Sequence, residues 1–379
     1  MVQRFLPNHP SVLLKEERPH EQLVSSLESI IRACPPQDTY SRHALHGLYS
    51  GPTSIAYLFL RLAQIYPNLV VEGHDASSWC RAYLLPSSRD HGRQPVEVTV
   101  HKCGVINEEL AACAILAAMT GDEEYCSILV HHTATVVQPG GSDEWLYGRA
   151  GFLYLLRMVR QWTPSSSTKE TMQACIKKVG DRIIQDGPPW RWHGKEYLGA
   201  VHGSVGIITQ LVLCNPDYAA HPKVTAALND LLRSQDSAGG NFPSSVESGR
   251  DSLVQFCHGA PGFVLSLPLI QKYFDAATQV TIDDCVARAR NCIWERGLLT
   301  KEPNLCHGAT ANALALTSPQ REHLMAYTTT KMVVKGIEEG WYIEGSDPCG
   351  LFCGEAGRAW GWAVIDAGKD LGIIGYSDV

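Results

Sequence analysis

The chain alternates two kinds of segment with helical periodicity. Segments of the first kind are apolar almost all round and follow a short glycine-containing motif, as IAYLFLRL does after Gly51. Segments of the second kind, such as those at 222–234 and 281–297, are amphipathic. A helix that is apolar on every side has to be buried, whereas an amphipathic helix covers a core with one face. We therefore expect buried inner helices and half-exposed outer helices, joined in pairs as helical hairpins.

The glycine motif recurs at nearly constant spacing. Its first glycine occurs seven times, at Gly51, Gly104, Gly148, Gly203, Gly259, Gly308 and Gly354. Intervals of about 50 residues suit two helices and two loops per repeat. Glycine at the entrance to a buried helix allows unusual φ angles and close backbone approach. We predict one domain over residues 1–379, an all-α ring of about seven hairpins, because an open stack would expose apolar end faces. Segments 84–100 and 161–170 are predicted to be surface loops.

Charge and cysteine content restrict the function and the compartment. The 32 basic and 39 acidic residues give a net charge of −7, and no basic run occurs, so a surface for nucleic acid or anionic membranes is not expected. No apolar run reaches the ~18 residues of a membrane span, and the N-terminal residues lack the apolar stretch of a secretory signal. The 13 cysteines then indicate the cytoplasm, with thiols either buried or bound to metal.

A tripeptide that occurs twice gives the clearest chemical signal. Cys257-His258-Gly259 and Cys306-His307-Gly308 are separated by one repeat, so they occupy the same place in adjacent hairpins, just ahead of inner helices. Two thiols and two imidazoles can converge there, and helix N-termini favour thiolates. Such a donor set suits Zn²⁺. The repeat symmetry alone does not say which histidine is the ligand.

Other polar residues lie at the same predicted rim. His202 holds the equivalent place one repeat earlier and is either a helix-capping residue or, near a zinc-bound thiolate, a general acid or base. Asp143 and Glu144 are either acids that complement a helix dipole or catalytic carboxylates. Cys349 and Cys353 are expected mainly to pack, with a redox role or a second metal site as the alternative.

Together these motifs resemble the lanthionine synthetase C-like family, especially its eukaryotic members. The resemblance is carried by FCHGAPG, LCHGAT, EWLYGRAGFLYLL and AVHGSVG and extends along the whole chain. It implies an α/α toroid of seven inner and seven outer helices. It also implies a zinc ion bound by Cys257, Cys306 and His307, with the fourth position open to water or a substrate thiol.

The resemblance further implies a reaction. Bacterial members of the family join a cysteine thiol to dehydroalanine or dehydrobutyrine in a precursor peptide, which closes thioether (lanthionine) rings. Eukaryotic members bind glutathione and are associated with its addition to dehydroamino acids in proteins. By motif position His202 corresponds to the proton donor and His258 to a residue lining the site. The catalytic acid of bacterial members corresponds to Glu144 or Asp143.

Two basic residues match the glutathione-binding pattern of the eukaryotic members. They are Arg4 and Lys301, whereas a third base expected before the last glycine motif is missing, and Glu344 and Asp347 stand in that stretch. We therefore expect a zinc-dependent transferase that adds glutathione, or another thiol, to a dehydroamino acid in a peptide or protein. The alternatives are a lanthionine-forming peptide cyclase and a non-catalytic zinc- and glutathione-binding adaptor of a kinase or receptor.

Overall fold

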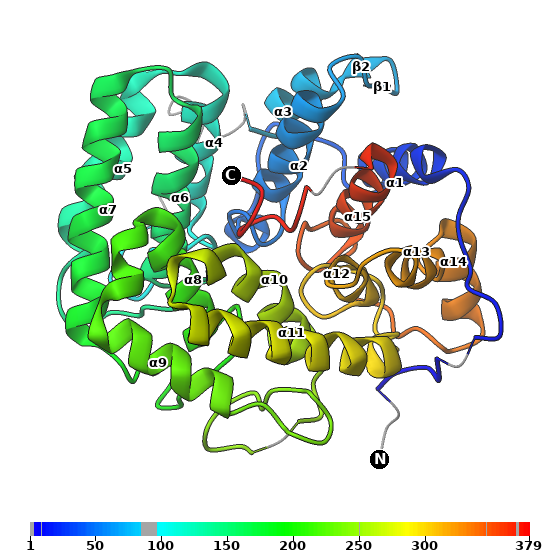
Figure 1. Cartoon of the computed structure of the whole chain (residues 1–379). Coiled ribbons are helices and arrows are strands. Elements are labelled where there is room, and N and C mark those ends of the chain that lie inside the picture. Colours follow the sequence, from blue (N-terminus) through cyan, green and yellow to red (C-terminus); the bar gives the residue numbers. More distant parts are fainter. Residues whose placement is uncertain (1–3, 9, 85–96, 250, 346, 369–370) are drawn as a thin grey trace. The chain divides into compact units, whose positions relative to one another are not determined.

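The computed structural model describes residues 4–368 and 371–379, except residues 9, 85–96, 250 and 346. Helices dominate the described chain (Figure 1), and a short antiparallel hairpin pairs β1 (Val70–Val71) with β2 (His74–Asp75). The chain divides into two compact units. The first unit contains Met1–Gln94 and Cys292–Gly372, and the second contains Pro95–Asn291 and Ile373–Val379.

In the second unit, helices that are buried almost all round alternate along the chain with helices that are buried mainly on one face. The apolar helices are α4 (Glu108–Thr120), α6 (Arg149–Trp162), α8 (Ser204–Cys214) and α10 (Ala260–Ile270). They pack in sequence, α4 on α6, α6 on α8 and α8 on α10. The other helices are α5 (Glu123–Val136), α7 (Ser166–Asp186), η3 (Pro216–Ala220), α9 (Pro222–Arg233), η4 (Gln271–Tyr273) and α11 (Ala276–Arg296). Helices α5, α7 and α9 pack on α4, α6 and α8, so each forms a hairpin with the apolar helix before it.

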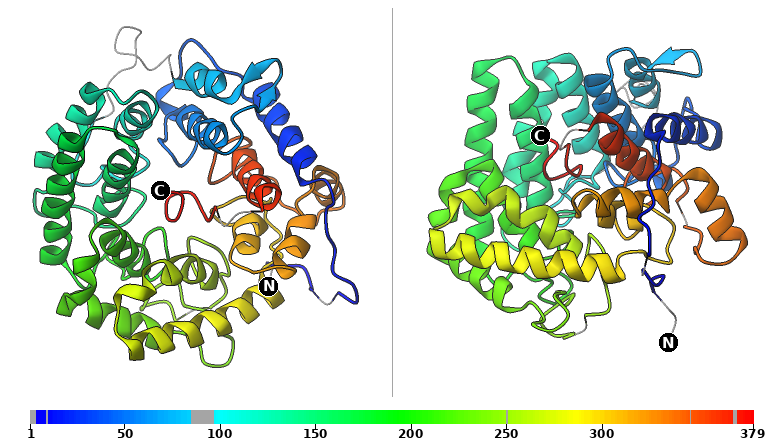
Figure 2. Two further views of the ribbon diagram at one scale, coloured as in Figure 1. Left: turned by 45° about the horizontal axis from the view of Figure 1, so that its top comes forward. Right: turned by 45° about the vertical axis from the view of Figure 1, so that its right-hand side comes forward.

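The first unit joins the N-terminal part of the chain to residues 292–372. Its helices are α1 (Pro19–Ala33), η1 (Arg42–Ala44), α2 (Pro52–Ile65), α3 (Ala76–Leu84), α12 (Ala309–Leu314), α13 (Gln320–Ala326), α14 (Thr330–Glu338) and α15 (Glu355–Ala367). Helix α15 packs on α1, α2, α12 and α13, and both views of Figure 2 show α1 and α15 side by side. The first and last hairpins therefore pack together, as the predicted closure of the chain requires.

The predicted inner helices are confirmed by their burial and by their first residues. In α8 every residue is buried except Leu213. Six of the seven motif glycines are the N-cap residues of α2, α6, α8, α10, α12 and α15. Gly104 instead lies three residues before Asn107, whose side chain caps α4 by accepting from the Leu110 amide. Glycine is required at Gly259, where φ is +105° and an added Cβ would collide with the Leu253 carbonyl.

The loop predictions had a mixed outcome. The loop predicted at 161–170 is wrong in extent, because α6 continues to Trp162 and α7 begins at Ser166. The Ser165 hydroxyl accepts from the Thr168 amide and caps α7, so serine begins a helix here rather than extending a loop. Most of the loop predicted at 84–100 lies outside the described residues.

The segment 373–379 fills the interior of the second unit. Tyr376 is fully buried and donates its hydroxyl hydrogen bond to the Ala200 carbonyl. Arg157 donates to the Tyr376 carbonyl at 2.8 Å, and Gln210 donates to the Gly375 carbonyl at 2.7 Å. This segment therefore braces α6 and α8, the helices that follow Tyr147 and His202.

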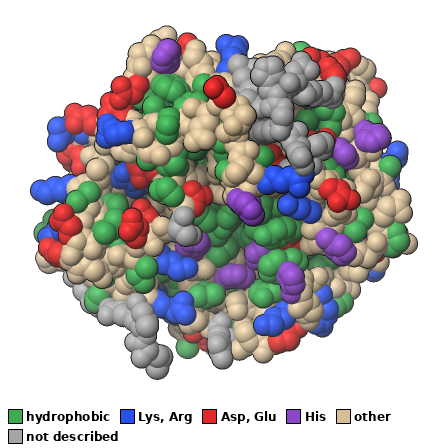
Figure 3. All heavy atoms as spheres, turned by 180° about the vertical axis from the view of Figure 1, so that it is seen from behind, with side chains coloured by type: hydrophobic (Ala, Val, Ile, Leu, Met, Phe, Trp, Pro, Cys, Tyr) green, Lys and Arg blue, Asp and Glu red, His purple; other side chains and the backbone are tan. Residues whose placement is uncertain are grey.

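The outer surface has no single dominant charge on the face drawn in Figure 3, where acidic and basic side chains are interspersed. Among the described residues, no helix combines the length and the hydropathy needed to cross a membrane.

Candidate functional site

A buried carboxylate and a histidine form the centre of the candidate site in the second unit. His202 Nδ1 lies 2.8 Å from Glu144 Oε2, and the Glu144 side chain is only 1% exposed. The amides of Leu146 and Tyr147 donate to the same carboxylate, one to each oxygen. Glu144 is thus fixed from three sides and holds the His202 ring in one orientation. Because Nδ1 is paired with the carboxylate, Nε2 is the nitrogen that remains for proton transfer.

Aromatic side chains cover the His202 ring. Trp192 stacks on it with ring centroids 3.9 Å apart and an interplanar angle of 4°. Tyr147 lies beside both rings, 5.9 Å from Trp192 and 6.4 Å from His202, and Tyr197 lies 6.2 Å from His202. His258, predicted to line the site, has its ring centroid 6.0 Å from that of His202.

The neighbouring carboxylate, Asp143, has a different contact. Its Oδ1 accepts from Arg149 Nη1 at 2.7 Å, and Arg149 is fully buried and also pairs with Asp186. Burial raises the pKa of Asp143 to about 6, although the Arg149 guanidinium opposes this shift. Of the two carboxylates predicted as alternatives, it is Glu144 that contacts His202, while Asp143 belongs to an ion-pair cluster at the start of α6.

The three predicted zinc ligands are divided between the units, and as a set they stay a prediction. Cys257, in the second unit, is buried, and Gln255 Nε2 donates to its Sγ at 3.1 Å. Cys306, in the first unit, is also buried, and the Tyr49 hydroxyl donates to its Sγ at 3.2 Å. Each sulfur therefore accepts a hydrogen bond, as metal-bound thiolates do in proteins.

His307 is partly buried next to Cys306. Burial and the nearby Lys301 ammonium lower the pKa of His307, so its ring is neutral at pH 7. A neutral imidazole is the form that binds metal.

Two further side chains are neighbours of Cys306. Cys353 was expected mainly to pack, and Tyr49 was not among the predicted site residues. A hydrogen bond to Cys306 and burial raise the pKa of the Cys353 thiol. Their positions in the motif could have revealed them. Tyr49 precedes its motif glycine by two residues, as Cys306 does, and Cys353 precedes its motif glycine by one, as His307 does.

The expectation that Cys349 mainly packs, and that the cysteines remain thiols, is wrong for one pair. Cys349 forms a disulfide with Cys34, which lies 315 residues away in the sequence. Cys34 ends α1 and Cys349 precedes α15, and these helices pack on each other. The sequence did not predict this pair, because the two cysteines come close only when the first and last hairpins pack together.

The two predicted glutathione-binding bases lie on adjacent strands of backbone in the first unit. The Arg4 carbonyl accepts from the Thr300 amide at 3.0 Å, and Phe5 pairs antiparallel with Leu299. Arg4 is therefore held beside the segment that continues into Lys301.

The segment before the last glycine motif, where a third glutathione-binding base was expected and is missing, has a structural role. Asp347 accepts hydrogen bonds from the amides of Cys349 and Gly350 and so shapes the turn before α15. Ile343 pairs with Lys301.

Comparison with known proteins identifies the fold and the family. Nisin cyclase has the same fold, with a TM-score of 0.61 at 12% identity over 94% of this chain and 96% of that protein. This likeness confirms the predicted fold class. Glutathione S-transferase LANCL1 of Danio rerio is 29% identical over 310 residues, which are 77% of this chain and 72% of the relative. LanC-like protein GCL1 of Arabidopsis thaliana is 30% identical over 190 residues, 48% of this chain and 43% of that protein. A family model described as lanthionine synthetase C-like protein matches residues 44–371. The chain therefore belongs to the lanthionine synthetase C-like family.

Proposed function

We propose that the protein is a zinc-dependent transferase that adds the thiol of glutathione to dehydroalanine or dehydrobutyrine in peptides or proteins, forming a thioether. The observation that carries this proposal is the buried Glu144–His202 pair, whose Nε2 is left for proton transfer. The similarity to a relative named glutathione S-transferase LANCL1 supports the choice of thiol.

The donor set proposed for zinc fits the metal. Cys257, Cys306 and His307 supply two sulfurs and one nitrogen, and zinc sites that act in catalysis leave a fourth position open. The hydrogen bonds to both sulfurs are consistent with thiolates. When bound, zinc would supply Lewis acidity that keeps the substrate sulfur as a thiolate at neutral pH.

The residues of the chain supply the proton chemistry. As the thiolate sulfur bonds to the β-carbon of the dehydroamino acid, the alkene electrons move toward the carbonyl and form an enolate. The proton on His202 Nε2 then passes to the α-carbon, and solvent reprotonates the ring. Glu144 stabilises the imidazolium before transfer and fixes its tautomer afterwards. Trp192 and Tyr147 keep one face of the ring away from water.

Recognition of glutathione is assigned to Arg4 and Lys301, since the tripeptide has two carboxylates and zinc would take only its sulfur. The adjacent backbone positions of the two residues support this assignment. We further propose that the protein works in the cytoplasm, where glutathione is abundant, and that residues 1–379 act as a single domain. The boundary between the units at Asn291–Cys292 falls inside the continuous helix α11, which supports this view.

The metal proposal is tested by zinc content. Purified protein is expected to contain about one zinc, and the cobalt form to show thiolate charge-transfer bands. Cys306→Ala should lose the metal, while Cys175→Ala, a buried thiol of α7 in the second unit, should keep it. Metal retained at full occupancy in Cys306→Ala would contradict the proposed ligand set.

The reaction is tested by mass spectrometry of a dehydroalanine peptide mixed with glutathione. Wild type should form the thioether faster than the uncatalysed solution reaction, and His202→Ala should lower the rate by about 10²-fold or more at unchanged zinc content. His221→Ala, at the N-cap of α9, is the control for loss of a histidine and should retain the rate. Ring closure within a peptide without use of glutathione would favour a cyclase. Glutathione binding without turnover would favour an adaptor.

A further inference from the structure

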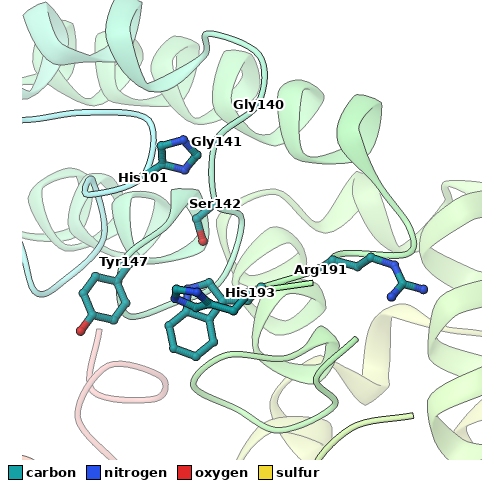
Figure 4. A pocket seen from close by; sticks show the side chains of 8 residues that line it. His101, Gly140, Gly141, Ser142, Tyr147, Arg191 and His193 are labelled. Atoms are coloured by element: carbon teal, nitrogen blue, oxygen red, sulfur yellow. The ribbon is translucent and has the colours of Figure 1, made fainter. Parts of the chain in front are cut away.

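The second unit contains a cleft that the proposed chemistry does not use. It has a volume of about 700 Å³. Its walls are the Gly140–Gly141 backbone, Ser142 and the aromatic rings of Tyr147 and Trp192, and its rim is formed by His101, Arg191 and His193 (Figure 4). Trp192 is shared with the candidate site, because its ring stacks on His202. The cleft therefore opens beside the proposed proton donor.

One side chain of the cleft lacks the partner that its burial requires. Ser142 is 7% exposed, and its hydroxyl has no hydrogen-bond partner among the described residues. Figure 4 shows this side chain directed between Tyr147 and His193. A buried hydroxyl without a partner costs about 1–3 kcal/mol, so a ligand that supplies the missing hydrogen bond would be stabilised at this position.

The chemical character of the cleft limits what the ligand can be. None of the described residues that line it is acidic, while His101, Arg191 and His193 are basic or can become so. Arg191 is already paired with Glu247 at 3.0 Å and with Glu196 at 3.8 Å. The two histidines are therefore the better candidates for contact with an acidic group of the ligand. An added Cβ at Gly140 would meet no atom within 4 Å. This open glycine and the two ring faces suit an extended backbone, which can approach glycine closely and lie flat on aromatic rings.

We propose that this cleft binds the acceptor peptide, namely an extended segment next to the dehydroamino acid that carries an acidic side chain. This inference rests on the proposed function, because it places the segment beside His202. The Ser142 hydroxyl hydrogen-bonds the peptide backbone, the acidic side chain meets the rim at His101 and His193, and the shared Trp192 ring fixes the distance from the bound segment to the proton donor.

The test separates binding from turnover. The probes are fluorescein-labelled peptides in which alanine replaces the dehydroalanine, flanked on one side by glutamate or by lysine, with binding followed by anisotropy. Wild type should bind the glutamate peptide more tightly than the lysine peptide. Ser142→Ala should weaken binding of both by about three- to tenfold through the lost hydrogen bond. His101→Glu should reduce the preference for glutamate by about two- to fivefold.

Gln161→Glu is the control for His101→Glu, since it places the same charge on the exposed end of α6, away from the cleft. It should leave both affinities within twofold of wild type. The proposal is overturned if wild type binds neither peptide, or if Ser142→Ala and His101→Glu behave like Gln161→Glu while their thermal unfolding matches that of wild type. If the peptides bind as expected and wild type forms no thioether, the proposed function fails and the peptide site stands.

Discussion

Adjacent residues of one type can serve separate purposes, and Asp143 and Glu144 are such a pair. Their sequence position placed both near the start of an inner helix, and that much was predictable. The choice between them was not, because it depends on which partner each carboxyl group meets. Those partners are His202, in the turn before α8, and Arg149, the first residue of α6. Trp192 was missed for the same reason, since it lies in a loop outside the glycine motif and is identified only by its stack on His202.

The raised pKa of Asp143 predicts a pH dependence of stability at the residue scale. An ordinary aspartate has a pKa of 3.8, and burial raises that of Asp143 to about 6. The folded protein thus holds this proton more tightly than the unfolded chain does. The contribution of Asp143 to stability is present below pH 3.8 and is lost as the pH rises through 6, by roughly 2–3 kcal/mol.

Urea unfolding of wild type and Asp143→Asn between pH 4 and 7 measures this contribution. The free energy of unfolding of the variant, relative to that of wild type, should rise with pH across this window and level off above it. Asp181→Asn, on the exposed face of α7, should show a constant difference from wild type. If the difference in unfolding free energy between Asp143→Asn and wild type is also constant with pH, the raised pKa of Asp143 is contradicted.

The helices show why the second glycine of the motif is needed. An added Cβ at Gly151, Gly206, Gly262 or Gly357 would collide with the carbonyl oxygen of the residue six positions earlier. The preceding loop therefore folds back onto the first turn of each helix. The repeat was visible in the sequence, but this reason for it was not. The first and sixth motifs have Ser54 and Ala311 at the same place, and the Ser54 hydroxyl accepts from the Leu351 amide.

Helix propensity and packing predict opposite outcomes for Gly206→Ala. Propensity alone would stabilise α8 by about 1 kcal/mol. The collision with the Ala200 carbonyl involves backbone that Tyr376 also holds, so we expect a loss of about 3 kcal/mol or more in the free energy of unfolding. Ala311→Gly, the reciprocal change in α12, should cost only about 1 kcal/mol. Urea unfolding decides between the two, and a more stable Gly206→Ala protein would refute the packing argument.

For the whole molecule, the repeat period was the most informative feature of the sequence. Hydrophobic periodicity and the glycine spacing predicted the hairpins and the pairing of the first hairpin with the last, and both are confirmed. Hydrophobic periodicity and glycine spacing do not predict contacts between irregular segments. Three such features were not predicted, because no repeated motif links the residues involved. They are the Cys34–Cys349 disulfide, the pairing of Phe5 with Leu299 and the burial of Tyr376. Each of these contacts depends on the positions that the loops and chain ends take up once the helices have packed.

Pairing of the first and last hairpins predicts that the end of the chain cannot be removed without loss of solubility. Deleting residues 340–379 removes α15, whose buried Trp360 and Trp362 lie among the helices of the first unit, and uncovers the apolar faces of α1 and α2. The protein should then aggregate during expression. Deleting only 373–379 leaves α15 in place and removes the segment around Tyr376 from the second unit, so that protein should stay soluble and melt at a lower temperature. Sedimentation and thermal unfolding of both deletions provide the measurement. A soluble 1–339 chain with one cooperative transition would show that α1 and α2 do not need α15, and the inference of closure would be lost.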